Sequence, residues 1–189
     1  MNLRTKKRLR QLPLIASVLL LAMWADCMLT GFTLGLFNHP RDRWGEAAMA
    51  IMREADTIEV IRLIKPAQLP RDFANLAYYG MVPTGDPIKP KAEWTTRLRE
   101  GVDNSWNYNW YMHARCLPEP GVCVRFHRGD EVVDLLLCFE CNLASLAAPD
   151  QHGGPIAEQW LDFRIRRSPF AELVKEIFPN DVAIQAIGN

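Results

Sequence analysis

Residues 116–141, CLPEPGVCVRFHRGDEVVDLLLCFEC, decide the fold of this chain. Between positions 122 and 126, valine and phenylalanine alternate with cysteine and arginine, which is the period-two pattern of a half-buried strand. Residues 131–141 form a second run rich in valine and leucine. The residues between, His127-Arg128-Gly129-Asp130, have turn chemistry, including a glycine that tolerates positive φ. The stretch therefore predicts a β-hairpin.

The turn sets the expected register of this hairpin. With Arg128-Gly129 as the two turn residues, Val124 faces Val133 and Cys116 faces Cys141. Cross-strand neighbours share a face of a sheet. One apolar face is therefore expected to carry Val122, Val124, Phe126, Val133, Leu135, Leu137, Phe139 and Cys141.

The same register separates the other two hairpin cysteines. Cys123 faces Asp134, four residues from Cys138, which is roughly 13 Å at the usual rise of a strand. A disulfide needs Cα atoms within about 7 Å. We therefore expect Cys116 and Cys141 to bond, and Cys123 and Cys138 not to bond to each other. Two prolines interrupt ladder pairing on the Cys116 side of the hairpin.

The motif CFEC at residues 138–141 has three chemical interpretations. A redox pair needs its first cysteine at a helix N-terminus, where the dipole lowers the thiol pKa, but Cys138 ends a predicted strand. A zinc site would have four ligands in Cys116, Cys123, Cys138 and Cys141, although alternate strand residues face opposite sides. An exported protein favours the third interpretation, one structural disulfide with two spare thiols. We expect no cofactor, with zinc as the alternative.

The hairpin also resembles a known group of proteins. Cys116, Pro118, Gly121 and Asp134, followed by CFEC at 138–141, resemble a family of small exported bacterial proteins whose second hairpin strand ends in a similar CFEC. Members of that family often carry an Arg-His pair before the glycine, where this chain has glutamate and proline. The resemblance implies location and fold, and it implies no activity.

The N-terminal segment has the composition of a membrane anchor. Five basic residues stand among the first ten positions, and a continuous apolar run of fourteen residues extends from Leu12 to Ala25. We expect an uncleaved signal anchor over residues 1–37, spanning the membrane at residues 12–32; a cleaved signal peptide is the alternative, which the poor cleavage motif before Asp26 disfavours. The basic cluster keeps the N-terminus cytoplasmic. The protein is then expected to be a single-pass protein of the bacterial cell membrane with an extracytoplasmic C-terminal domain.

The remaining chain predicts one domain over residues 38–180 and a tail over residues 181–189. Helices are predicted at 40–55 with Asn38 as its cap, at 91–100 ended by Gly101, and at 169–178, with a helical turn at 69–76. Strands are predicted at 57–64, 77–82, 106–112, 122–126, 131–141 and 161–165, with a loop at 83–90. This order gives an α+β fold, an antiparallel sheet with helices packed on one face, preceded by an N-terminal transmembrane helix.

Composition and motifs narrow the function classes. From residue 38 onward the chain has 17 basic and 21 acidic residues, so it lacks the basic surface of a nucleic-acid-binding protein. The chain has no glycine-rich phosphate loop, GxSxG or HExxH motif. Trp106, Tyr108 and Trp110 alternate with polar residues and form a candidate contact surface, or else a sheet strand that lies under a helix.

These observations favour a non-catalytic interaction or scaffold module that is anchored in the membrane and faces away from the cytoplasm. The sequence does not name its protein partner. The alternative is a zinc-binding or thiol-active module that uses the four hairpin cysteines.

Overall fold

An antiparallel sheet of six strands forms the centre of the fold. The strands are β1 (Thr57–Ile64), β2 (Val82–Ile88), β3 (Val122–Arg128), β4 (Glu131–Cys138), β5 (Leu143–Ala147) and β6 (Trp160–Asp162). Their order across the sheet is β2-β1-β3-β4-β5-β6, and every neighbouring pair is antiparallel. The α+β class with an antiparallel sheet is therefore confirmed.

The structure, a computed structural model, describes residues 39–67, 77–110, 116–149, 160–163 and 169–188. The chain divides into two compact units, Met1–Phe37 and Asn38–Asn189, and the described residues all belong to the second. The expected anchor over residues 1–37 lies outside the described residues. Within the described ranges, no helix combines the length and the apolar character that crossing a bilayer requires.

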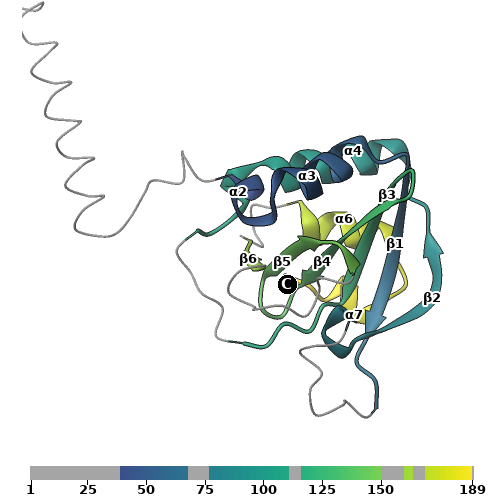
Figure 1. Ribbon diagram of the computed structural model, residues 1–189. Coiled ribbons are helices and arrows are strands. Elements are labelled where there is room, and N and C mark those ends of the chain that lie inside the picture. The colour runs from purple at the N-terminus through teal and green to yellow at the C-terminus, as the bar shows by residue number, and fades with distance from the viewer. Residues whose placement is uncertain (1–38, 68–76, 111–115, 150–159, 164–168, 189) are drawn as a thin grey trace, which may run out of the picture. The chain divides into compact units, whose positions relative to one another are not determined.

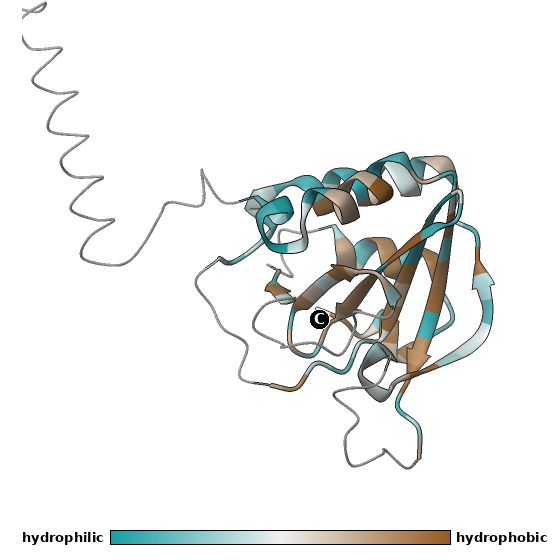
Figure 2. Cartoon of the chain, viewed as in Figure 1, coloured by the Kyte–Doolittle hydropathy of each residue, from teal (hydrophilic) through white to brown (hydrophobic). Residues whose placement is uncertain are grey.

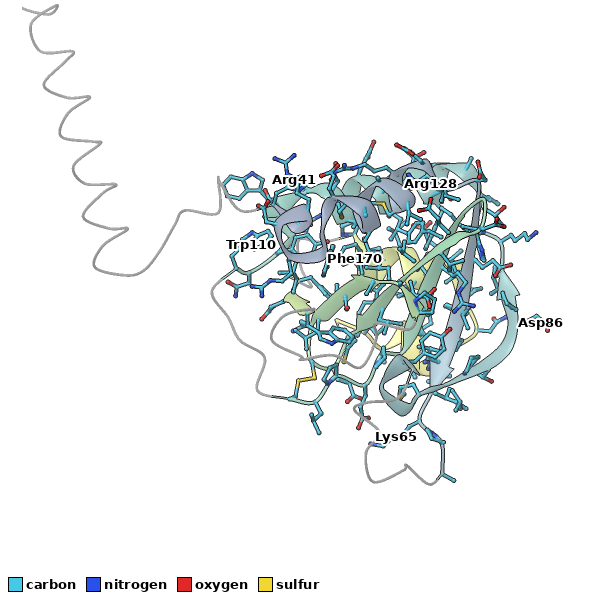
Figure 3. All side chains as sticks on the ribbon, in the orientation of Figure 1. Arg41, Lys65, Asp86, Trp110, Arg128 and Phe170 are labelled. Carbon is cyan, nitrogen blue, oxygen red and sulfur yellow. A yellow bond between two sulfur atoms is a disulfide. The ribbon has the colours of Figure 1, made fainter. Side chains whose placement is uncertain are left out.

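The described helices pack on one face of the sheet, which we call the helix-covered face (Figure 1). They are α2 (Pro40–Trp44), α3 (Glu46–Glu54), α4 (Ala92–Asp103), α6 (Phe170–Ile177) and α7 (Val182–Gln185). Two 3₁₀ turns complete the described elements: η3 (Ser105–Asn107) follows α4, and η2 (Ala77–Gly80) precedes β2, where its Tyr78 packs on the opposite face of the sheet. Side chains from these helices and from alternate strand residues form the main core, in which Phe170 is fully buried (Figure 3). Figure 2 shows the hydropathy of each residue: the inner strands of the sheet are mostly apolar, and β2 at its edge is more polar.

The hairpin forms as expected, but its register differs by two residues. Gly129, with φ +56°, and Asp130 form the turn, so Arg128 pairs with Glu131 and Val124 pairs with Leu135. Arg128 extends the ladder because its guanidinium Nε and Nη2 bind the Glu131 carboxylate at 2.9 and 2.8 Å. A shift of two residues keeps every side chain on its face.

The predicted apolar face of the hairpin is therefore correct for all but one of its members. Its valines, leucines and phenylalanines join the main core, with Phe139 partly buried. Cys141 instead packs with the second core on the opposite face of the sheet, because it lies in the turn after β4, beyond the regular alternation.

The first predicted helix, 40–55, is broken into α2 and α3 at Gly45. Gly45 has φ +84°, a backbone conformation that a helix interior does not contain. The cap of α2 is His39, whose Nδ1 accepts a hydrogen bond from the Arg41 N–H at 3.2 Å, while Asp42 binds the His39 N–H in return. The prediction of Asn38 as the cap was wrong.

The strand after β1 is displaced from its predicted position. Residues 77–80 form the 3₁₀ turn η2, and β2 occupies residues 82–88, where a proline-containing loop was predicted. β2 is an edge strand, so Pro83 and Pro87 need not donate a ladder hydrogen bond on both sides. Proline was therefore a misleading signal at this position.

The later elements differ from the prediction in smaller ways. β5 was not predicted. The predicted strand 131–141 runs into residues 139–142, which in the structure form a short loop that returns the chain into the sheet. The expected tail contains α7, whose Ile184 is buried in the main core. The helical turn predicted at 69–76 lies outside the described residues, as do positions 164 and 165 of the last predicted strand.

Gly101 lies inside α4 rather than at its end, since the helix continues to Asp103. A Cβ atom at position 101 would lie 2.5 Å from Cγ and 3.1 Å from Cδ of Pro169. The proline ring has little freedom to move away. We expect Gly101→Ala to lower the free energy of unfolding by about 1–3 kcal/mol, as overpacking does, despite alanine's higher helix propensity. Urea denaturation measures this change, and a stabilised variant would contradict the close packing of α4 on α6.

Candidate functional site

The cysteine end of the sheet is the end where residues 116–121 enter β3 and residues 139–142 leave β4. The structure brings Cys116 and Cys141 to disulfide distance there, with Cα atoms 6.3 Å apart. Cys123 and Cys138 are free thiols, both buried, and are not bonded to each other. The pair expected to bond is the pair that the structure joins.

The reason for this pairing differs from the predicted one. The last ladder contact on this side is the hydrogen bond from Gly121 N–H to the Leu137 carbonyl, 3.0 Å long. Pro118 and Pro120 lie beyond it, so Cys116 is not a ladder partner of Cys141. Instead the disulfide ties an irregular loop to the turn after β4.

Cys138 is held between the same two segments. Its Sγ accepts a hydrogen bond from the Glu119 N–H at 3.3 Å, and the N–H groups of Glu140 and Cys141 also point at the sulfur. Burial raises the pKa of the Cys138 thiol, while the N–H groups of Cys141 and Glu119 oppose that shift. The thiol is therefore protonated near neutral pH. Cys138 ends a strand, as expected, which is not the position of a redox cysteine at a helix N-terminus.

A pocket of about 300 Å³ opens beside these cysteines. Its apolar lining comes from the end of β1, from the segment before β2, from the turn after β4, and from α7 and the residues that follow it: Leu63, Ile64, Met81, Phe139, Ala183, Ile184 and Ile187. Four charged residues also line it: Arg62, Lys65, Glu119 and Glu140. Lys65 and Glu119 form an ion pair. Figure 3 shows Lys65 at the end of the molecule that carries the disulfide, and Arg128 at the opposite end.

Arg62 holds three walls of this pocket together. Its Nη1 donates to the Gly121 carbonyl at 2.8 Å, and its Nε donates to Asp181 Oδ2 at 2.6 Å. Asp181 also caps α7, because its Oδ1 accepts a hydrogen bond from the Ile184 N–H at 3.0 Å. Both charged side chains are largely buried, at 17% exposure for Arg62 and 26% for Asp181.

The pairing with Arg62 predicts a pH dependence. The hydrogen bond from Arg62 lowers the pKa of Asp181, so the pair stabilises the fold fully above the unfolded-state pKa of about 3.9 and loses its effect as the pH falls through the lower folded-state pKa. We expect Asp181→Asn, which keeps the helix cap, to cost about 1 kcal/mol at neutral pH. Urea titrations at several pH values check this: the gap to the wild type should shrink below about pH 4. A gap that widens in acid would contradict the pairing.

Several segments that line the pocket also carry exposed apolar side chains. The described residues include six large hydrophobic side chains that are exposed: Ile64, Val82, Ile88, Trp106, Leu117 and Val182. Ile64 lines the pocket and pairs with Val82 across the sheet edge. Val182 precedes Ala183 of the lining, and Leu117 lies in the loop that supplies Glu119. Of these four, Ile64 alone lines the pocket, and the other three belong to segments that supply lining residues. Apolar exposure that gathers on neighbouring segments is typical of binding surfaces.

A second polar cluster lies on the face of the sheet opposite to the helix-covered face. Arg125 binds the fully buried Asp134 through two hydrogen bonds, Nε–Oδ1 at 2.8 Å and Nη2–Oδ2 at 2.9 Å. The Tyr78 hydroxyl accepts a further hydrogen bond from Arg125, and Cys123 bonds the same carboxylate. The bond to Asp134 raises the pKa of Arg125, and burial raises the pKa of Tyr78 to about 12 and that of the Cys123 thiol well above its usual range. At neutral pH the cluster is one buried ion pair with two neutral neighbours.

Sequence reasoning missed both charged pairs. Asp134 stands within the apolar run of β4, and a carboxylate in such a run needs a buried partner. That signal identifies Asp134 as a paired residue. No comparable signal connects Arg62 to Asp181, which are 119 residues apart in the chain.

The structure does not bring the aromatic residues 106–110 into one contact surface. Trp106 is 58% exposed, whereas Tyr108 is fully buried in the main core, where its hydroxyl donates to the Val102 carbonyl at 2.9 Å. Trp110 packs partly buried against that core. The expected strand is replaced by η3 and a single bridge between Tyr108 and Phe163, because the Asn104 side chain accepts from the Trp106 N–H and starts a 3₁₀ turn.

The zinc alternative has no preformed site in the part of the chain that the structure describes. No group of three or more histidine, cysteine, aspartate or glutamate side chains converges there in an arrangement that could hold a metal. Of the four proposed ligands, two are joined in the disulfide and the other two are buried free thiols.

Comparison of the chain with protein-family models, with curated proteins and with solved structures finds no match.

Proposed function

We propose that the protein is a membrane-anchored, extracytoplasmic interaction module that binds an apolar side chain of a partner protein in the pocket at the cysteine end. The observation that carries this proposal is the apolar lining of that pocket, which includes the exposed Ile64 and comes from segments that expose further apolar side chains. A volume of about 300 Å³ is at the lower limit of small-molecule sites and fits one or two side chains. The four charged residues that also line the pocket suit the polar part of a protein interface.

The location in the proposal rests on the N-terminal sequence. A basic cluster followed by an apolar segment is expected to retain residues 1–37 as an anchor, with the domain exported. Intact mass of protein extracted from membranes checks this. A new N-terminus near Asp26 would identify a cleaved signal peptide instead, and fractionation would then find the domain free of the membrane.

Site-specific photo-crosslinking in the full chain tests the binding surface. Ile64 and Ile88 are matched positions, because both are exposed isoleucines at the β1–β2 edge, at 42% and 36% exposure, but only Ile64 lines the pocket. A photoreactive residue at position 64 should give a discrete crosslinked protein in cells, while one at position 88 should not. Equal crosslinking at both positions, or none at position 64, would contradict the proposal.

Metal analysis separates this proposal from the zinc-binding alternative. The interaction module uses its cysteines for structure, so the purified full-length protein should contain zinc far below one equivalent. Stoichiometric zinc that is lost together with Cys123 and Cys138 would favour the metal-binding function.

A further inference from the structure

We propose that the disulfide exchanges within the cysteine end, so that Cys138 displaces Cys116 from Cys141 and a Cys138–Cys141 disulfide forms. This inference concerns a chemical activity of the cysteines and does not depend on a partner in the pocket. Its basis is that the loop carrying Cys116 and the turn carrying Cys141 both contact the Cys138 sulfur through backbone N–H groups.

The first step is that Cys138 and Cys141 can bond. Residues 139–142 form a four-residue hairpin loop between the paired residues Cys138 and Leu143, and Asn142 at its end has φ +56°. Loops of this length are most often built around a type I turn, whose first and fourth Cα atoms lie within about 7 Å. That distance falls in the range that a disulfide bridges. The N–H of Cys141 already points at the Cys138 sulfur.

The second step is that Cys116 is the sulfur free to leave. Cys116 and Leu117 are exposed, and the two prolines that follow keep this segment out of the ladder. Cys141 is fixed by the turn, and its Sγ lies 3.6 Å from the Leu117 carbonyl oxygen. The Cys138 sulfur accepts a hydrogen bond from Glu119 of the same loop, which keeps loop and thiol together.

The exchange needs no external oxidant or reductant. Cys138 releases its proton to solvent, and the thiolate attacks Sγ of Cys141. The Cys138–Cys141 bond forms as the Cys116–Cys141 bond breaks, and Cys116 leaves as a thiolate that takes up a proton. One disulfide and one thiol remain throughout. The product differs in that its thiol is exposed, whereas Cys138 is buried.

Alkylation followed by non-reducing peptide mapping of the full-length protein tests the exchange. The protein is held at mildly alkaline pH, samples are quenched in acid over time, and exposed thiols are trapped with iodoacetamide. We expect alkylated Cys116 and a Cys138–Cys141 peptide to accumulate together. Both products should be lost in Cys138→Ala and unchanged in Cys123→Ala, which removes the other buried thiol. A map that shows only the Cys116–Cys141 peptide at every time would overturn the proposal.

A second variant keeps the test independent of the exchange rate. Cys116→Ser leaves Cys138 and Cys141 as the only thiols of the described loop and turn, so mild oxidation should join them. Recovery of both as alkylated thiols, from protein whose circular dichroism matches the wild type, would show that the turn does not allow the bond and would also overturn the proposal.

Discussion

Replacing Arg125 with alanine is expected to lower the free energy of unfolding by about 3–5 kcal/mol, the range found when one partner of a buried ion pair is removed. The substitution leaves the Asp134 carboxylate, which has no solvent exposure, without its charged partner. The Tyr78 hydroxyl and the Cys123 thiol are neutral and cannot replace a guanidinium. Urea denaturation of the Asn38–Asn189 unit, followed by circular dichroism, measures this loss.

Two further variants test whether the loss of stability in Arg125→Ala arises from the burial of the unpaired charge. Arg97→Ala removes an exposed pair with Glu176, 2.8 Å long, and should cost less than about 1 kcal/mol. The double change Arg125→Met with Asp134→Leu removes both charges and should recover most of the stability lost in Arg125→Ala. If Arg125→Ala and Arg97→Ala cost the same, Asp134 is not a buried, desolvated charge.

Removing the disulfide with Cys116→Ser and Cys141→Ser together is expected to cost about 3 kcal/mol. The bond closes a loop of sequence separation 25, and the cost is the conformational entropy that the unfolded chain regains. For a domain of this size the melting temperature should fall by about 6–12 °C. Thermal unfolding followed by circular dichroism measures the shift.

Reductant provides the control for this double variant. It should lower the melting temperature of the wild type to about that of the double variant and leave the variant unchanged. The single change Cys116→Ser should fall between the two, since Cys138 and Cys141 remain able to bond. A wild-type protein whose melting temperature is insensitive to reductant would contradict a stabilising disulfide.

Much of the sheet is predictable because side-chain alternation survives errors of register. The hairpin turn lies one residue later than predicted, yet Val122, Val124 and Leu135 face the main core as expected, because a shift of two preserves the face. β2 was missed because Pro83 and Pro87 suggest a loop, and only the position of the strand at the sheet edge permits them.

The candidate site is less predictable because it is assembled by long-range contacts. Arg62, Glu119, Glu140 and Ile184 meet at one pocket from four separate segments. No periodicity or local motif relates these positions. Only the cysteines marked this end of the domain in the sequence, and they did so because a disulfide is itself a long-range contact.

The most direct test of the binding pocket combines crosslinking with a substitution that fills it. Ala183 and Ala186 are both exposed at the C-terminal end of the domain, but only Ala183 lines the pocket. With a photoreactive residue at position 64, Ala183→Trp should abolish the crosslinked product and Ala186→Trp should leave it unchanged. Retention of the crosslink in a folded Ala183→Trp protein would show that the partner does not enter this pocket.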